Sequence, residues 1–488
     1  MMFLMIITFY TSRVVLDKLG VEDYGIQNVV GGLASMFVFF RSSLSNATQR
    51  FISVALGKND IDETIKIFSQ HQTLYIAITV LVVVIAESMG LFFLYHKLVI
   101  PEERLNAAFW VFQFTVAALV FTILTTVYDS ILIAHEEMKV YSYIGIAEGI
   151  AKLGIAFIIS IVSFDKLITY SCLLTFVSIG TFSCYHLYCK HKYVEAHYKY
   201  IWDRKSIKET FSFISWNVVG TAVWAINDQG INVLLNMFFG PVVNAARGLA
   251  FQVSQGVNHF SANFYTAIRP QITKSYASGE YNYLFKLIFC SSKYSIYLLW
   301  YLSLPLIMCI DYVLQLWLKE VPEYTNVFCV WVLLYSLVNS LTNPIWTLAL
   351  AIGKLKKYIL IGSGVFLMTF PIAYLALRYG CSPISVFIIA FFVRVCYIIV
   401  VLSIVRCYIT FSLKVYSLKV ILPSALVVVP SGLLGYIIKP YIDNSIYGLI
   451  IAGICSTLVI SVLIWICGID KNEREYVKSF IRSKIKAR

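Results

Sequence analysis

Apolar stretches recur along this chain from its first residue to about residue 468, and each is close to the length of a membrane-spanning helix. A helix needs about 20 predominantly apolar residues to cross a hydrocarbon core about 30 Å thick. The sequence therefore predicts an all-α polytopic membrane protein with about fourteen transmembrane helices. The expected spans lie near 1–16, 25–47, 67–95, 108–133, 142–163, 168–188, 211–238, 243–266, 285–310, 325–352, 357–378, 383–408, 417–438 and 445–468.

Composition supports this interpretation and excludes several other classes of protein. The chain is 59% hydrophobic and 13% charged, whereas soluble domains carry about 25% charged residues. The eleven cysteines lie mostly within apolar runs, and no CxxC pair or histidine cluster has metal-ligand spacing, so we expect neither a metal nor a cofactor. The net charge of +13 resides in short loops between apolar runs, which argues against a nucleic-acid partner.

The distribution of basic residues predicts the orientation of the chain. If the N-terminus is cytoplasmic, the loops after even-numbered helices hold most of them, including the cluster at 190–208 and the tail at 471–488. This bias of roughly three to one places both termini in the cytoplasm, because loops rich in Lys and Arg stay on the cytoplasmic side. The opposite loops hold only Arg13, Lys18, Lys97, Arg104, Lys166, Lys319, Arg378 and Lys439.

The first span opens at Met1 without a basic flank, and no A-x-A-like cleavage site follows it. A secretory signal peptide would carry both features. We therefore interpret the segment as a short or truncated first helix.

An internal repeat relates the segment that starts at Gly20 to the segment that starts at Gly240. In each, a glycine turn precedes a weakly polar helix that ends at an arginine, Arg50 or Arg269, and an amphipathic linker follows. An even number of helices separates the copies, so we expect parallel repeats related by an axis along the membrane normal.

The repeat predicts two six-helix lobes with a central cavity, and the substrate site, between them. The predicted parts are an N-terminal lobe at 1–200, a C-terminal lobe at 201–412, two peripheral transmembrane helices at 413–470 and a basic cytoplasmic tail at 471–488.

Two stretches, YTSRVVLDKLGVEDYGIQNVVGG and SSLSNATQRFISVALGKND, resemble the polysaccharide flippases of the multidrug/oligosaccharidyl-lipid/polysaccharide exporter superfamily, and the O-antigen (Wzx-type) branch in particular. The resemblance is strongest over residues 8–70 and 211–280. Related proteins carry a longer cytoplasmic lead-in before the first helix.

This resemblance implies a protein of the bacterial inner membrane that works by alternating access. Its substrate would be an undecaprenyl-pyrophosphate-linked oligosaccharide repeat unit, moved from the cytoplasmic to the periplasmic leaflet for O-antigen (lipopolysaccharide), capsule or exopolysaccharide synthesis. A polysaccharide polymerase that takes the exported unit is an implied partner.

Charged residues inside predicted helices are the first candidates for function, because charges within a bilayer are costly. Arg41, Arg247 and Arg394 lie within apolar runs and have no acidic residue three or four positions away. We interpret them as a cationic, substrate-binding cavity for pyrophosphate or acidic sugars. The alternative is an arginine that reaches from near a helix end to the headgroups. Arg13 matches the Ser-Arg at the end of the family's first helix, and faces the cavity mouth or anchors the helix at the interface.

Asp228 is the candidate for coupling transport to an ion gradient, because no ATP-binding motif is present. It lies in the polar triplet Asn227-Asp228-Gln229, where a carboxylate can carry a proton or bind Na⁺. An ion pair with Arg247 is the alternative.

Glu148 and Lys152 are interpreted as a structural pair on one helix face. Uncharged candidates for hydrogen bonds to sugars or between helices are Gln27, Asn28, Asn217, Asn227, Gln252 and Asn258.

Other functions remain open at this point. A lipid II flippase or a multidrug exporter would share the architecture, although a cationic drug favours an acidic cavity. If the protein is instead an enzyme, the alternative is a membrane polysaccharide polymerase or ligase. No predicted outer loop exceeds roughly 15 residues, and no catalytic set appears at useful spacing. We therefore expect a transporter and not an enzyme.

Overall fold

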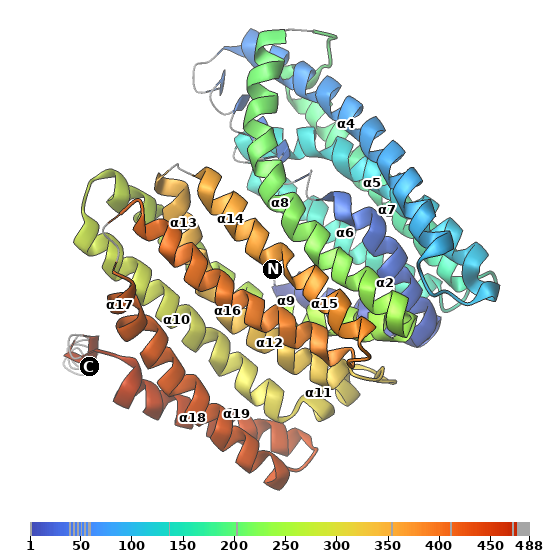
Figure 1. Ribbon diagram of the computed structural model, residues 1–488. Helices are drawn as coiled ribbons and strands as arrows, with labels where there is room; N and C mark the ends of the chain where they lie inside the picture. Colours follow the sequence, from blue (N-terminus) through green and yellow to red (C-terminus); the bar gives the residue numbers. More distant parts are fainter. Residues whose placement is uncertain are drawn as a thin grey trace, which may run out of the picture. The chain divides into compact units, whose positions relative to one another are not determined.

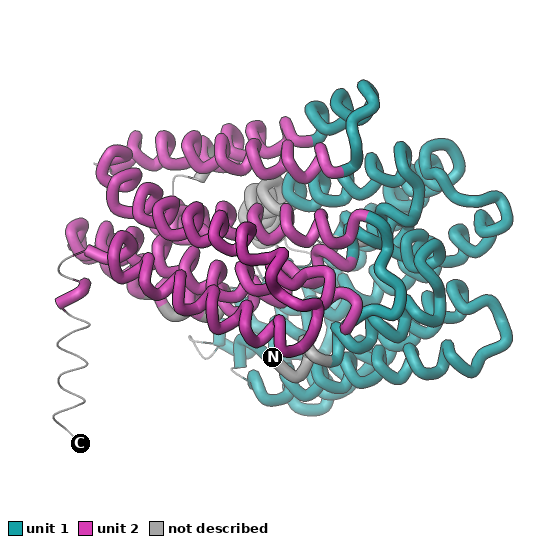
Figure 2. Tube along the Cα trace, turned by 90° about the horizontal axis from the view of Figure 1, so that it is seen from below, with its two compact units in different colours: residues 1–248, 317–323, 370–383 teal, residues 249–316, 324–369, 384–488 magenta. Residues whose placement is uncertain are grey.

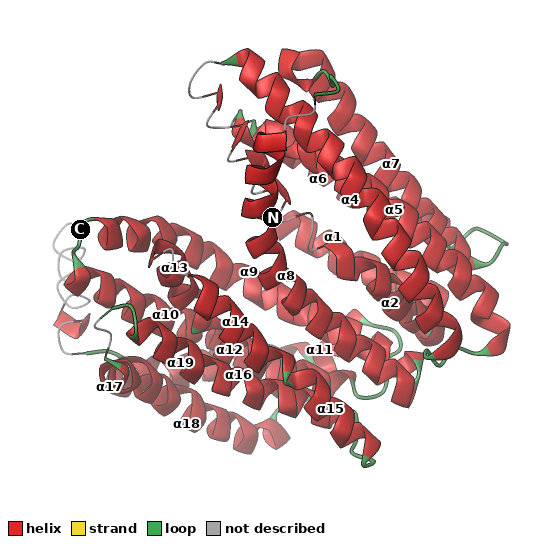
Figure 3. Cartoon of the chain, turned by 45° about the horizontal axis from the view of Figure 1, so that its top comes forward, coloured by secondary structure: helices red, strands yellow, loops and turns green. Residues whose placement is uncertain are grey.

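The computed structural model describes most of the chain, and the part that it describes is helical, with no strand (Figure 3). Arg50, Lys58 and all but three residues of the predicted tail at 471–488 lie outside the described residues. The described ranges are 2–38, 41, 44–45, 48–49, 51–52, 55–56, 60–135, 137–201, 204–352, 355–409, 412–470 and 473–475.

The helices follow one another along the chain in the order predicted (Figure 1). Those of the first half are α1 (Met2–Leu19), α2 (Val21–Ser35), α4 (Ile61–His96), α5 (Leu105–Ala134), α6 (Met138–Ile158) and α7 (Lys166–Lys192). Those of the second half are α8 (Arg204–Phe239), α9 (Pro241–Ala277), α10 (Tyr281–Met308), α11 (Ile310–Trp317), α12 (Thr325–Ser340), α13 (Thr342–Ile352), α14 (Leu355–Leu367), α15 (Thr369–Arg378) and α16 (Ile384–Arg406). The last are α17 (Leu413–Tyr416), α18 (Leu422–Ile438) and α19 (Ile446–Leu463).

The predicted all-α membrane architecture is confirmed. Within the described residues, nine segments are long and apolar enough to cross a membrane, and α10 with α11, bent by 81°, makes up to ten. The helices α1, α2, α8 and α9, which are not among these segments, occupy the other predicted spans. The structure is therefore consistent with about fourteen transmembrane helices.

Two predicted spans are broken helices. The span at 325–352 is divided into α12 and α13, and the span at 357–378 into α14 and α15. Pro344 and Pro371 follow these breaks within the first turn of α13 and α15. Proline is tolerated in the first turn of a helix, where its missing N–H has no intrahelical partner.

The glycine turns of the repeat are present in both copies. Gly20 joins α1 to α2 with a φ of 84°, and Gly240 joins α8 to α9 with a φ of 76°. This left-handed backbone region favours glycine, which has no Cβ. Each turn lets two long helices reverse direction without an intervening loop.

The chain forms two compact units (Figure 2). Unit 1 comprises residues 1–248, 317–323 and 370–383, and unit 2 comprises 249–316, 324–369 and 384–488. These units are groups of closely packed residues, and the predicted lobes at 1–200 and 201–412 stay a prediction. In unit 1, α5 packs against α4 and α7 around buried side chains such as Phe68 and Ile131.

In unit 2, the C-terminal helices α18 and α19 pack on one face of α10. Trp300 donates to Ser431 over 2.7 Å, and Tyr297 donates to the carbonyl of Gly468 over 3.0 Å. One end of this face carries an ion pair between the buried Lys293 and Glu473, 2.6 Å apart. A row of polar contacts therefore fixes the residues at 413–470 to α10.

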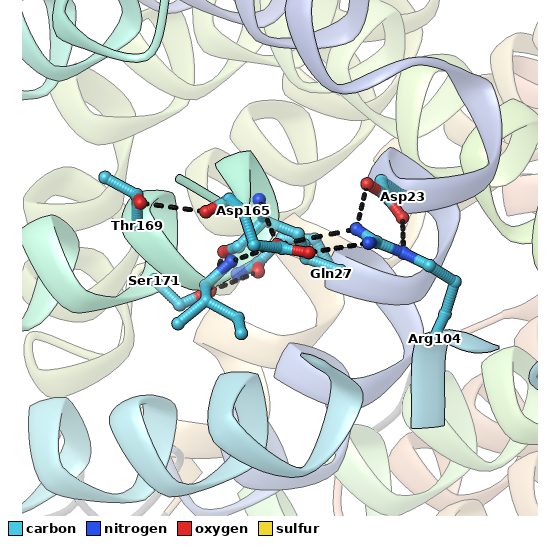
Figure 4. A network of polar contacts seen from close by, with 8 residues as sticks. Asp23, Gln27, Arg104, Asp165, Thr169 and Ser171 are labelled. Atoms are coloured by element: carbon cyan, nitrogen blue, oxygen red, sulfur yellow. Dashed lines mark hydrogen bonds and ion pairs between the residues drawn. The ribbon is translucent and has the colours of Figure 1, made fainter. Parts of the chain in front are cut away.

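A second charged cluster joins three loops of unit 1 (Figure 4). Arg104, between α4 and α5, donates to Asp23 at the start of α2 and, over 2.6 Å, to Asp165 before α7. Asp165 also accepts from the backbone of Leu167 and Ile168 and so caps α7. Burial alone would raise the pKa of Asp165, but hydrogen bonds from Ile168 and Arg104 outweigh it and lower that pKa. Burial dominates at Asp23 and raises its pKa.

We expect Arg104→Met to destabilise unit 1, because it leaves two carboxylates without their shared cation. The expected loss is on the order of 1–2 kcal/mol, since the cluster is partly exposed to solvent. Thermal unfolding of the purified protein in detergent measures it. The matched control is Lys152→Met, which breaks the confirmed but exposed Glu148–Lys152 pair of 2.6 Å and should cost about 0–0.5 kcal/mol. Equal effects of the two substitutions would contradict the expected role of Arg104.

We expect the segment between α7 and α8 to be cytoplasmic. Residues 189–210 lie in one of the loops that are rich in Lys and Arg, and such loops stay on the cytoplasmic side. Alkaline phosphatase, which is active only in the periplasm, would be fused after Lys205 at the start of α8. We expect no activity there, and activity from a control fusion after Arg104. The reverse pattern would show that the predicted orientation is wrong.

Candidate functional site

Arg394 is the most distinctive of the predicted site residues, and it lies in unit 2 on α16. Its guanidinium donates to the side-chain oxygen of Asn339 and, over 2.9 Å, to the hydroxyl of Thr342. Asn339 is near the end of α12 and Thr342 begins α13, so the side chain bridges the break between these helices. Broken helices within a membrane are tolerated where they line a cavity or are buried in protein.

Aromatic rings surround the same guanidinium. Its central carbon lies 4.4 Å from the ring centre of Tyr397, 5.8 Å from that of Phe366 and 5.9 Å from that of Tyr335. Phe366 is the second-last residue of α14 and therefore lies next to the break between α14 and α15. Gly362 leaves room for the ring of Tyr397, which would lie 3.1 Å from a Cβ at that position. Ring faces attract a cation, so these contacts hold the guanidinium in place.

The charge of Arg394 is not neutralised by a carboxylate of the described residues. Its polar partners are an amide and a hydroxyl, and its Nε is buried without a hydrogen-bond partner there. An arginine carries five N–H donors in a planar fork that matches carboxylate and phosphate oxygens. The arrangement is suited to binding an anion that reaches these unused donors.

Arg41 has a partner from another helix. Its guanidinium lies 3.0 Å from the carboxylate of Asp129 on α5, and the Asp129 side chain is almost fully buried. Asp129 is also close to Ser130, which lies 3.3 Å from Ser45. About a third of the Arg41 side chain remains exposed. A structural pair accounts for these contacts, and part of the Arg41 side chain stays exposed to solvent.

Arg247 and Asp228 form the ion pair that the sequence left open as one of two alternatives. Their side chains are 2.6 Å apart across the α8–α9 turn, and Arg247 also donates to the backbone carbonyl of Asp228 over 2.9 Å. Arg247 is buried. This pair is compatible with a coupling role for Asp228, which stays a prediction.

The other predicted residues lie in several different places. Arg13 is half-buried on α1. Gln27 accepts a hydrogen bond from Ser171 on α7, and Asn258 donates to Ser336 on α12. Asn227 is buried on α8, while the side chain of Asn217 lies outside the described residues.

Sequence reasoning did not single out Asp129 and Lys293, which are charged residues within predicted spans. Asp129 is in the span at 108–133 and Lys293 in the span at 285–310. Both are buried in the structure and each pairs with an opposite charge far away in the sequence. Both would have been found if every charged residue within a predicted span had been treated as a candidate, because an intramembrane charge is costly.

Comparisons with known proteins relate this fold to transporters. No protein-family model and no curated protein matches the chain. The structure is similar to a lipid II flippase, MurJ, in an inward closed conformation, with a TM-score of 0.68, 14% identity, and coverage of 95% of this chain and 99% of the other. It is also similar to an inward-facing multidrug resistance MATE family transporter of the MOP superfamily, with a TM-score of 0.70, 14% identity, and coverage of 82% and 94%.

A MATE protein in complex with MaD3S matches less closely, with a TM-score of 0.54, 11% identity, and coverage of 82% and 96%. At these identities, the likeness establishes the fold. This chain has the fold of the multidrug and lipid II transporters, and the solved structures named here are transporters or flippases and not enzymes.

Proposed function

We propose that this protein is a flippase for undecaprenyl-pyrophosphate-linked oligosaccharide repeat units in the bacterial inner membrane, serving O-antigen, capsule or exopolysaccharide synthesis. The observation that carries the proposal is Arg394, a cation at a helix break that has no carboxylate partner among the described residues. Such a charge within a membrane protein costs several kcal/mol unless it serves a ligand or another charge. A pyrophosphate supplies oxygens that match its unused donors.

The similar structures are of two kinds, a lipid II flippase and multidrug transporters, and each kind suggests a different substrate for this protein. The lipid II flippase covers 95% of the chain, whereas the multidrug transporters described above cover 82%. The TM-scores of 0.68 and 0.70 fit both kinds of transporter equally, and it is the cation Arg394 that supports an anionic, lipid-linked substrate over a cationic drug. Lipid II carries the same pyrophosphate chemistry, so a lipid II flippase is the second candidate. The resemblance of residues 8–70 and 211–280 favours the O-antigen branch.

The remaining features of the proposal follow from this assignment. The lipid-linked oligosaccharide moves between leaflets by alternating access of the two predicted lobes, with both termini in the cytoplasm. A proton or Na⁺ gradient supplies direction, and a polysaccharide polymerase takes the exported unit. The protein itself makes and breaks no covalent bond of the substrate.

Deletion of the gene in its native bacterium tests the proposed substrate. We expect undecaprenyl-pyrophosphate-linked oligosaccharide to accumulate in the cytoplasmic leaflet and surface polysaccharide to be lost. Accumulation of lipid II would instead support the second candidate. Increased drug sensitivity without any lipid-linked intermediate would overturn both.

We expect Arg394→Ala to reduce export about 10- to 100-fold, since a charge-assisted hydrogen bond contributes about 1.5–3 kcal/mol. Arg394→Lys keeps the charge without the fork and should retain more activity. Export of surface polysaccharide in the deletion strain measures both, normalised to protein in the membrane. Arg41→Ala and Arg247→Ala should also reduce export, and their thermal unfolding separates loss of binding from loss of the ion pair. Normal export by all three alanine variants would place the site elsewhere.

Asp228 is expected to couple transport to an ion gradient. Asp228→Asn removes the charge while it keeps a side chain of the same size near Arg247. Transport in reconstituted vesicles would be compared with and without an imposed proton or Na⁺ gradient. We expect the variant to lose the stimulation by one of these gradients. If it keeps the full gradient dependence of the wild type, Asp228 is not the coupling group.

A further inference from the structure

The side of α12 and α13 that meets Arg394 carries aromatic residues before and after the polar ones. Tyr335 is four residues before Asn339 on α12, and Trp346 is four residues after Thr342 on α13. Residues four positions apart are neighbours on one face of a helix. Asn339 and Thr342 both accept hydrogen bonds from Arg394, and the ring of Tyr335 lies near its guanidinium. Trp346 therefore belongs to the side of α13 that carries the cation's hydroxyl partner.

The exposure of Trp346 sets it apart from the rest of α13. Its side chain is 37% exposed, whereas every other residue of α13, a helix that the structure describes in full, is buried or half-buried. A helix that turns an apolar face outward exposes several large side chains, as α18 does with Leu426, Val429 and Leu433. On the enclosed helix α13, a ligand can reach one large aromatic surface.

Neighbouring residues hold the indole of Trp346 in position. Its ring centre lies 5.3 Å from that of Tyr358 on α14, and Tyr358 is buried. On α9, Tyr265 donates through its hydroxyl to the carbonyl of Asn343 and contacts the hydroxyl of Thr347. α13 also packs against α14 and α16 (Figure 1). A ring held in this way loses little conformational freedom when a ligand binds, which favours binding.

We propose that Trp346, supported by Tyr358, is a sugar-binding platform next to Arg394. The pyrophosphate of the substrate binds the guanidinium, and the first sugar packs its ring on the exposed indole. The proposal rests on the proposed function and adds to it which part of the substrate is recognised beyond the charge.

The chemistry of the two side chains suits these two adjoining groups. A pyranose ring presents C–H groups on one face, and the negative face of an aromatic ring attracts them. Four residues of an α-helix rise by about 6 Å. A ligand that binds Arg394 beside Thr342 must therefore extend beyond its pyrophosphate to reach Trp346. The sugar that is linked directly to the pyrophosphate extends it in this way.

The predicted orientation of the chain agrees with this placement. The segment 325–352 is the tenth predicted span, so it runs from the outer face to the cytoplasmic face when the N-terminus is cytoplasmic. Trp346 then lies on the cytoplasmic side of Arg394. The sugars of the proposed substrate start in the cytoplasm, whereas its lipid chain stays in the bilayer. The aromatic surface is thus on the side from which the sugars enter.

Binding of two lipids to the purified, full-length protein tests the platform. The probes are undecaprenyl pyrophosphate and the same lipid with one N-acetylglucosamine on its pyrophosphate. We expect the wild type to bind the glycosylated probe about 10-fold more tightly, because an aromatic contact contributes on this order. Trp346→Leu should lose this preference and keep the wild-type affinity for undecaprenyl pyrophosphate. Trp346→Phe, which retains a smaller ring, should keep part of the preference.

The matched control is Trp331→Leu. The ring of Trp331 packs on that of Phe391, with centres 5.8 Å apart, and so also joins α12 to α16. Trp331 is eight residues before Asn339, away from the proposed sugar, and its replacement should leave the preference unchanged. Arg394→Ala should weaken the binding of both probes, because both carry the pyrophosphate.

The outcomes separate failure of the platform from failure of the proposed function. An unchanged preference in Trp346→Leu overturns the platform and leaves the proposed function intact, and Trp346 then belongs to the aromatic belt of the membrane interface. Equal binding of the two probes by the wild type also overturns the platform alone. If the wild type binds neither probe, the proposed function fails and the platform with it. If thermal unfolding shows that Trp346→Leu does not fold, Trp346→Met, which fills the space without a ring, replaces it with the same expected result.

Discussion

The energetic cost of a charge within a hydrocarbon core determines how the charged residues of this structure are arranged. Insertion of a charged residue at the centre of a membrane helix costs about 2.5–3.5 kcal/mol. The chain reduces this cost by pairing charges between helices: Arg41 with Asp129, Arg247 with Asp228, and Lys293 with Glu473. Each pair fixes two segments to each other, because separating them would leave a buried charge unpaired. Arg394 is held instead by an amide, a hydroxyl and aromatic rings, and so keeps its positive charge available.

Much of the fold was predictable from local sequence. Hydrophobic length gave the positions of the helices, since a membrane helix satisfies its own backbone and needs only apolar side chains. Gly20 and Gly240 marked turns, since their backbone conformation excludes other residues. The Glu148–Lys152 pair followed from spacing on one helix face and is confirmed. These features depend on residues a few positions apart, so one sequence suffices to find them.

The candidate site was less predictable because its contacts join distant helices. Arg41 has no acidic neighbour on its own helix face, and its partner Asp129 lies 88 positions away. The breaks at 341 and 368 were also missed, although a proline, Pro344 or Pro371, follows each of them. Asn339 and Thr342 next to the first break interact with Arg394 from α16. Only the tertiary structure shows that this polar sequence surrounds a cation.

The repeat shows how two related segments divide their contacts. Gln27 and Arg247 occupy equivalent positions, and each binds within its own half: Gln27 to Ser171 of α7 and Arg247 to Asp228 of α8. The next positions, Asn28 and Gly248, meet each other across the repeat. On α2 and α9, the residues at one pair of equivalent positions thus form contacts within their own repeat, and the residues at the next positions form the contact between the repeats. The contact between the copies is therefore made of small and polar groups, whereas the contacts within the copies include the buried charge pair of Arg247 with Asp228.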